Sequence, residues 1–121
     1  MKQSPTNEAT QLILNFLFKK GIYAKRHGVT GFSRDNHFYQ AGVPGGSDIF
    51  AWLPPHCIFL GIELKRGHDK LRPEQEGFIK NIQLMGGGVI VARGESANDM
   101  FADFQEQFKT YEAALKVIHT S

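Results

Sequence analysis

Two acidic residues and one lysine lie in a stretch that otherwise consists of apolar residues. Asp48 precedes the run Ile-Phe-Ala-Trp-Leu, and Glu63 and Lys65 end the run Cys-Ile-Phe-Leu-Gly-Ile-Glu-Leu-Lys. A strand that is apolar on both faces does not end in unpartnered charges, because burying an unpaired charge costs on the order of several kcal/mol. We therefore expect Asp48, Glu63 and Lys65 to form a site.

The two apolar runs are separated by the sequence Pro-Pro-His at positions 54–56, which predicts an antiparallel β-hairpin. If these three residues form the turn, Leu53 pairs with Cys57, whereas a turn one residue longer places Asp48 directly opposite Glu63. Both alternatives place the two carboxylates at the open end of the hairpin, where opposed Cβ atoms are roughly 5 Å apart. Carboxylates this close either share a proton or bind a cation, and their hard oxygen atoms suit Mg²⁺ or Mn²⁺.

A helix is expected from Pro73, since proline is favoured at the first helical position and acidic residues follow it. Gln75 lies three and four residues before Phe78 and Ile79, which places its amide on the apolar face of this helix. A buried amide is usually satisfied by a backbone group. Close to the carboxylate pair it can instead orient the attacking water or a phosphate, and the sequence leaves both roles open.

These residues carry a resemblance to a known family. The motifs Gly-Gly-Ser-Asp48, Glu63-Leu-Lys65 and Arg72-Pro-Glu-Gln75 resemble those of the VRR-NUC (virus-type replication-repair nuclease) family in the PD-(D/E)xK nuclease superfamily. The similarity covers most of the chain. It implies a restriction-endonuclease-like α/β core, a mixed sheet flanked by helices, and a divalent-metal-dependent DNA endonuclease of replication or repair.

The resemblance also implies roles for individual residues. Asp48 and Glu63 would hold Mg²⁺ or Mn²⁺, with the backbone carbonyl of Leu64 as a further ligand and a helix-borne glutamate, Glu8, contributing to the metal site. The alternative for Glu8 is a first-turn acid that interacts favourably with the helix dipole. Lys65 would lower the pKa of the attacking water or stabilise the pentavalent phosphate, although it can also act as a counter-ion to the two acids.

Basic residues are concentrated in the part of the chain that carries these motifs. Residues 1–72 hold ten Lys or Arg against five Asp or Glu, whereas residues 73–121 hold four against seven. This asymmetry suits a polyanionic partner such as DNA. The basic residues that we expect to contact DNA are Lys25, Arg26, Arg34, Arg66, His68, Lys70 and Arg72.

The remaining elements follow from periodicity and from glycine and proline positions. In chain order we expect a helix over residues 4–20, a strand over 22–26, a loop-like segment over 27–46, the hairpin, the helix from 73, a strand over 89–92 and a helix from 96. In the loop-like segment, basic and aromatic residues alternate in a way that suits phosphate contact and base stacking. The alternative is a solvated loop held over the core by its aromatic rings.

The last helix carries an aromatic seam that bears on assembly. Its spacing of three and four residues is typical of a core or subunit contact, and its aromatic members are Phe101, Phe104, Phe108 and Tyr111. Either the chain's own sheet covers this seam, or a second chain covers part of it. The resemblance favours the second alternative, because junction resolution is the activity expected of small, stand-alone members of the family. One carboxylate site cuts one strand at a time, so the resemblance implies a homodimer that acts on branched DNA such as a Holliday junction.

The composition sets outer limits on the class of protein. A length of 121 residues, 41% hydrophobic and 21% charged, predicts one globular domain over residues 1–121 with no membrane span. The one cysteine, Cys57, lies among apolar residues and is expected to be a buried core thiol in a reducing compartment. We therefore expect a cytoplasmic protein of a bacterial or phage-infected cell.

Two functions from other classes compete with the nuclease. A non-catalytic nucleic-acid binding module would use the same basic residues without a metal, and a structural protein would use Glu63 and Lys65 only as an ion pair at a strand end. The presence of Asp48, Glu63, Lys65 and Gln75 together favours the nuclease over both.

Overall fold

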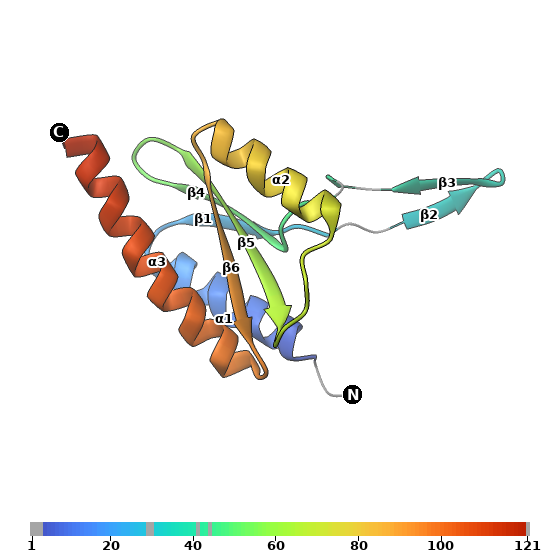
Figure 1. Ribbon diagram of the computed structural model, residues 1–121, viewed down its shortest axis with the longest axis horizontal. Coiled ribbons are helices and arrows are strands. Elements are labelled where there is room, and N and C mark those ends of the chain that lie inside the picture. The colour runs from blue at the N-terminus through green and yellow to red at the C-terminus, as the bar shows by residue number, and fades with distance from the viewer. Residues whose placement is uncertain (1–3, 29–30, 41, 44, 121) are drawn as a thin grey trace.

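The computed structural model describes the backbone of residues 4–28, 31–40, 42–43 and 45–120, and their side chains except those of 31–34, 37–40 and 119–120. Its elements are α1 (Pro5–Lys19), β1 (Tyr23–Arg26), β2 (Gly31–Arg34), β3 (His37–Gln40), β4 (Ile49–Leu53), β5 (Ile58–Arg66), α2 (Pro73–Leu84), β6 (Gly88–Gly94) and α3 (Ala97–Thr120). The main sheet has the order β1-β4-β5-β6, in which β5 and β6 are parallel and the other neighbours antiparallel. The expected mixed sheet flanked by helices is confirmed (Figure 1).

Helix α1 begins and ends where the sequence predicts. The Oγ atom of Ser4 accepts a hydrogen bond from the backbone N–H of Asn7 at 3.2 Å. Pro5 occupies the first helical position, where its missing N–H costs no intrahelical bond. Gly21 follows the helix with a φ of +75°, a conformation that glycine adopts without steric cost. All of these signals are local, so the sequence alone reveals them.

One face of the main sheet packs against α1 and α3 and forms the apolar core. The fully buried residues that the central hairpin contributes are Ile49, Ala51, Leu60 and Ile62. Helix α1 contributes Ala9, Ile13 and Leu17 to the same cluster. Full burial of each larger aliphatic side chain stabilises the fold by about 1.5–3 kcal/mol. This layer holds the hairpin in place against the two helices.

The aromatic seam of α3 is covered by elements of the same chain. Phe104 is fully buried and Phe108 is 2% exposed. The ring of Phe16 in α1 packs edge-on against both rings, with centroid distances of 5.7 Å in each case. Phe104 and Phe108 therefore follow the first of the two alternatives and offer no surface to a second chain. Phe101 and Tyr111, at the two ends of the seam, are half-buried. The homodimer stays a prediction.

Helix α2 covers the central part of the opposite face of the sheet. Phe78 of α2 contacts Phe50 of β4 and Phe59 of β5, with ring centroids 6.0 and 6.4 Å away. Along β4, Phe50 and Trp52 are half-buried, whereas the residues that alternate with them are buried. The α2 face is therefore aromatic and partly open, in contrast to the closed α1 and α3 face.

The segment that we expected to be loop-like contains a two-stranded ribbon. Strands β2 and β3 pair antiparallel with Arg34 opposite His37, and the turn residues Asp35 and Asn36 have φ angles of +52° and +65°. Asp and Asn tolerate this left-handed conformation better than most residues, so the pair is a two-residue hairpin turn. The loop prediction is wrong for residues 31–40. Figure 1 shows this ribbon extending away from the main sheet.

The hairpin turn is one residue longer than the sequence Pro-Pro-His. Leu53 pairs with Ile58, so residues 54–57 connect the two strands. Cys57 lies in this turn with a φ of +56° and is exposed. The prediction of a buried core thiol is wrong, because one additional turn residue moves Cys57 out of the strand.

Helix α3 is the longest helix, with 24 residues. The Oγ atom of Ser96 accepts a hydrogen bond from the backbone N–H of Asp99 at 3.1 Å, so Ser96 caps the start of this helix, as expected for a helix that begins at residue 96. Within the part of the chain that the structure describes, no helix has the length and apolar character needed to cross a membrane.

Candidate active site

The register of the central hairpin brings the two predicted carboxylates together. Ile49 pairs with Ile62, so the preceding residue, Asp48, lies opposite Glu63. This is the second of the two registers that the sequence allowed. Side chains alternate along a strand, so both acids lie on the α2 face of the sheet.

Asp48 is fixed from two sides by backbone hydrogen bonds. Its Oδ2 atom accepts the N–H of Leu64 at 2.7 Å, and its backbone carbonyl accepts the N–H of His27 at 2.7 Å. The first bond ties the carboxylate to β5, and the second ties the start of β4 to the residue after β1. Asp48 therefore keeps its position relative to Glu63 without help from a metal ion.

Glu63 is 5% exposed and is held by the helix that covers this face. Its Oε1 atom accepts a hydrogen bond from Nε2 of Gln75 at 2.9 Å, and Oε1 of Gln75 accepts the backbone N–H of Arg72 at 2.9 Å. Gln75 is itself 4% exposed. The predicted bond to a backbone group is therefore present at one end of the Gln75 amide, and the other end orients the Glu63 carboxylate. A role of Gln75 toward water or phosphate stays a prediction.

The surroundings of Glu63 favour its protonated form. Burial comes first, followed by the negative charge of Asp48 and a hydrogen bond with it, and together they raise the pKa of Glu63 to about 8. The positive charges of Lys65 and Arg72 act in the opposite direction and lower this pKa in part. Without a cation, the carboxylate pair therefore holds a proton at neutral pH.

The donor set fits a hard divalent cation. Two carboxylates that oppose each other on a largely buried face repel, and either a proton or a cation relieves that repulsion. All side-chain donors of the pair are oxygen atoms, which Mg²⁺ and Mn²⁺ prefer. The residues that would hold such an ion are Asp48 and Glu63, with the Leu64 carbonyl as the backbone ligand that the family resemblance implies.

Glu8 lies on the first turn of α1 and is exposed. Among the residues that the structure describes, no three His, Cys, Asp or Glu side chains lie close enough together to hold a metal ion. In this arrangement Glu8 therefore does not complete a three-carboxylate site with Asp48 and Glu63. It lines a separate surface hollow with Gln11 and Asn98, and a role at the metal stays a prediction.

His27 positions the segment that leads to Asp48, a role that the sequence analysis missed. Its Nε2 atom accepts the backbone N–H of Val43 at 3.1 Å, so we assign the ring proton to Nδ1, which lies 3.1 Å from the carbonyl oxygen of Ser47. The ring stacks on Phe50 with a centroid distance of 4.2 Å. No spacing rule signals such a contact, because its partners are backbone groups about twenty residues away.

The glycines before Asp48 allow two close backbone approaches. Gly45 has a φ of +72°, and a Cβ atom there would lie 2.2 Å from the carbonyl oxygen of Glu74 in α2. A Cβ atom on Gly46 would lie 2.7 Å from the ring of His27. These two glycines therefore allow the segment before Asp48 to lie directly against α2 and the His27 ring.

The predicted DNA-contacting residues border this site in two groups. One group is exposed between Lys65 and Gln75: Arg66 is the last residue of β5, and His68, Lys70 and Arg72 lie on the connection from β5 to α2. Lys25 and Arg26 are exposed on β1, where Arg26 donates a hydrogen bond to Oδ1 of Asn7. Arg66 also lies 4.0 Å from Glu95 in an exposed ion pair. The side chain of Arg34 lies outside the described part of the structure.

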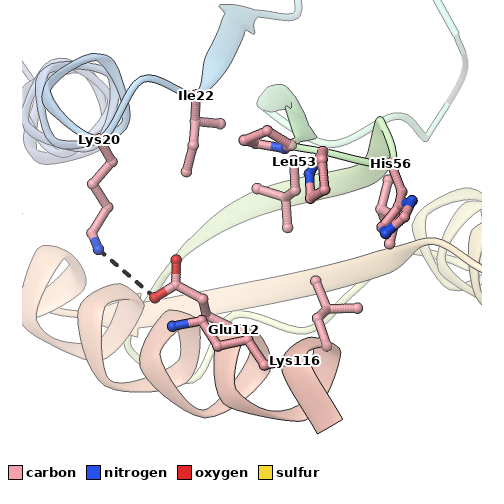
Figure 2. A pocket seen from close by; sticks show the side chains of 10 residues that line it. Lys20, Ile22, Leu53, His56, Glu112 and Lys116 are labelled. Atoms are coloured by element: carbon pink, nitrogen blue, oxygen red, sulfur yellow. Dashed lines mark ion pairs between the residues drawn. The ribbon is translucent and has the colours of Figure 1, made fainter. Parts of the chain in front are cut away.

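A separate cavity of about 380 Å³ lies at the turn end of the hairpin, between residues 54–56 and α3. Figure 2 shows Leu53 and His56 on one side of it and the Lys20–Glu112 ion pair, 3.7 Å long, on the other. Its lining is mainly apolar and includes neither carboxylate of the pair. The carboxylate pair lies at the opposite, open end of the hairpin.

The family model for the VRR-NUC domain matches residues 16–96. The matched segment contains Asp48, Glu63, Lys65 and Gln75 and begins after Glu8. No curated protein matches the sequence.

Proposed function

Because this chain belongs to the VRR-NUC family of nuclease-type domains, we propose that it is a divalent-metal-dependent endonuclease that hydrolyses phosphodiester bonds in DNA. The observation that carries the proposal is the opposed pair Asp48 and Glu63, with the pKa of Glu63 raised by burial and by Asp48. A fold that needs only stability has no use for two repelling carboxylates on a covered sheet face. Catalytic sites do place such groups together.

The residues of the site divide the work of hydrolysis. A water oxygen attacks the phosphorus while the bond to one sugar oxygen breaks, so negative charge grows on the phosphate oxygens. The cation held by Asp48 and Glu63 would supply a water of lowered pKa and positive charge at the phosphate. Lys65 follows Glu63 by two residues on the same strand face and stabilises the growing charge. Gln75 keeps the Glu63 carboxylate in place.

The exposed basic residues hold the DNA backbone at this site. Arg66, Lys70 and Arg72 lie on the connection that leads from Lys65 to α2, so phosphates next to the cleaved bond would meet them first. Phosphate contacts of this kind carry no base specificity but supply much of the affinity, and they weaken with salt.

Branched DNA is the substrate that we propose within this class, and a homodimer is the assembly. One carboxylate pair cuts one strand at a time, so paired cuts on a two-fold substrate such as a four-way junction need two sites related by symmetry. Phe104 and Phe108 of the α3 seam supply no such contact because α1 covers them, so a contact on the seam would use the half-buried Phe101 and Tyr111.

A non-catalytic DNA-binding module is the second candidate. The observation that favours it is the exposure of Lys25, Arg66, Lys70 and Arg72, which would bind DNA without any cation. A non-catalytic module gives no reason for the unfavourable free energy of burying Glu63 next to Asp48, so we favour the nuclease.

A cleavage assay separates the two candidates. Purified protein is incubated with Mg²⁺, Mn²⁺ or EDTA and with equimolar duplex, flap, single-stranded and four-way-junction DNA. We expect cleavage that requires a divalent ion, is strongest on the junction, and is lost in Asp48→Asn. DNA binding without cleavage in either ion, with equal binding by Asp48→Asn, would support the non-catalytic module.

A further inference from the structure

The α2 face of the sheet carries an open aromatic pair at its β1 edge. Tyr23 of β1 and Trp52 of β4 are direct register partners, and their rings stack with a centroid distance of 5.2 Å and an angle of 28°. Tyr23 is 61% exposed, and Trp52 is half-buried. Two large rings held at the surface provide a flat apolar area with polar atoms at its edge.

This pair is held in a fixed position from behind. The ring of Trp52 also contacts Phe59 edge-on at 6.0 Å, and Phe59 contacts Phe50 edge-on at 5.0 Å. Phe50 in turn stacks on Phe78 of α2. The pair is thus the exposed end of a continuous aromatic layer, so its rings are already ordered for a ligand that stacks on them.

A hollow of about 490 Å³ lies next to the two rings. Its other walls are Gly21 and the hairpin turn, with Pro54, Pro55 and Cys57. These lining residues are small or apolar and carry no charge, so the hollow suits a flat, uncharged group of a ligand. A nucleobase presents such a flat surface, and stacking accepts any base.

The pair shares its sheet face with the carboxylate site. Along β4, Asp48, Phe50 and Trp52 alternate with buried residues, so all three lie on the α2 face. Trp52 follows Asp48 by four residues along the strand, which corresponds to a rise of about 13 Å. Lys25 pairs with Phe50, so an exposed cation lies between the aromatic pair and the acids. A cation in this position complements the phosphates of a strand that spans the two sites.

We propose that Tyr23 and Trp52 form a stacking site for an unpaired base of the substrate strand, with Lys25 contacting the phosphate backbone between that base and the cleaved bond. This proposal rests on the proposed nuclease function and narrows its substrate class. A base inside a duplex has both faces covered by its neighbours, so only a strand with unpaired nucleotides fills the site. The enzyme would therefore prefer branched or single-stranded DNA over continuous duplex of equal charge.

The chain contains one tryptophan, so the fluorescence of Trp52 reports directly on this site. The experiment titrates the protein in EDTA with oligothymidylate and, separately, with a blunt duplex of the same length. We expect the single strand to quench Trp52 emission and the duplex to bind with little quenching. Tyr23→Ala should weaken single-strand binding by about five- to a hundredfold, and Tyr23→Phe should retain it, because stacking requires the ring and not the hydroxyl.

Phe18→Ala is the matched control, since Phe18 is an 82% exposed aromatic residue on α1. It should leave single-strand affinity unchanged. Unchanged affinity in Tyr23→Ala, or equal quenching by duplex and single strand, would overturn the proposal. A shift from dimer to monomer in Tyr23→Ala by light scattering would also overturn it, by assigning the pair to a subunit contact.

The assay contains no divalent ion, so its outcome does not depend on cleavage. If single-stranded DNA quenches Trp52 emission but the protein shows no Mg²⁺-dependent cleavage, the nuclease proposal is rejected and the stacking-site proposal is supported. If cleavage requires Asp48 but Tyr23→Ala does not change DNA binding, the nuclease proposal is supported and the stacking-site proposal is rejected.

Discussion

The two faces of the main sheet use the same strands for different purposes. Toward α1 and α3, Ile49, Ala51 and Ile62 are fully buried among apolar neighbours. Toward α2, the residues that alternate with them include Asp48 and Glu63, which repel each other. Because alternate residues of one strand serve both faces, the apolar face fixes the geometry that the charged face requires. The apolar core residues Ile49 and Ile62 are therefore direct sequence neighbours of the two acids.

This difference predicts which substitutions each face tolerates. The core face requires apolar residues of similar volume, so substitutions there should lower the free energy of unfolding. The α2 face carries groups that lower the stability of the fold, so substitutions of these groups should reduce activity while the protein still folds.

Neutral amides in place of the carboxylates should abolish cleavage and leave the fold intact. Asp48→Asn or Glu63→Gln would remove a ligand of the proposed divalent ion, so we expect a loss of about a thousandfold or more in turnover. DNA affinity should change little, since phosphate contacts come from the exposed basic residues. Turnover on a labelled junction and thermal unfolding measure the two effects in one preparation.

Ile62→Val is the matched control, because Ile62 neighbours Glu63 but faces the core. We expect it to lower the free energy of unfolding by about 0.5–1.5 kcal/mol and to leave turnover nearly unchanged. A carboxylate variant that unfolds, or an Ile62→Val protein that loses activity at full stability, would contradict the separation of the two faces.

Lys65→Ala should lower turnover by about a hundred- to a thousandfold, because it removes one positive group at the charged phosphate. Affinity for Mn²⁺, measured by calorimetry, should change much less than turnover. Lys65→Arg keeps the charge and serves as the comparison. Equal losses of ion affinity and turnover in Lys65→Ala would assign Lys65 to the structure of the site instead of the reaction.

Removing the His27 ring should reduce turnover indirectly, by about ten- to a hundredfold. The ring donates to the Ser47 carbonyl and accepts from Val43, so its loss frees the segment that carries Asp48. A small displacement of a catalytic group is costly in rate. His27→Ala should therefore weaken Mn²⁺ binding as well as turnover, whereas His27→Asn, which keeps a donor close to the position of Nδ1, should recover part of both.

The sequence predicts those parts of the structure that depend on local signals. Ser4 and Pro5 at the start of α1 and Pro73 at the start of α2 specify helix ends through residues next to them. The open end of the hairpin was predictable for the same reason, since either turn length brings Asp48 close to Glu63. Only the exact register needed the structure, because it depends on whether Cys57 belongs to the turn.

The features that the sequence did not reveal depend on distant contacts or on an uncommon backbone conformation. His27 binds backbone groups of residues 43 and 47, and no side-chain spacing announces such bonds. The ribbon over residues 31–40 turns at Asp35 and Asn36, a pair that is also common in loops. The Tyr23–Trp52 contact could have been found, because pairing the strand over residues 22–26 with the hairpin places two aromatic residues side by side.

The last prediction concerns stability against pH in the absence of a divalent ion. The pKa of Glu63 is raised from its ordinary value of 4.5 to about 8 in the folded protein, so the folded state binds this proton more tightly than the unfolded chain does. The resulting stabilisation is fully present below about pH 4.5 and is lost as the pH rises through 8. Between these values the free energy of unfolding should fall with pH, by at most about 1.4 kcal/mol per pH unit.

Urea unfolding in EDTA at pH 5, 6, 7 and 8 measures this slope, and Glu63→Gln isolates the contribution of the carboxyl group. Because the variant has no proton to lose at this position, its stability should vary less over the same range, and it should exceed the wild type most at pH 8. Mg²⁺ should stabilise the wild type at pH 8 and not the variant, since binding to the folded state alone adds to its stability. If the free energy of unfolding varies with pH in the same way in both proteins, the Asp48–Glu63 pair does not destabilise the fold. The two sheet faces would then not differ in their electrostatic cost.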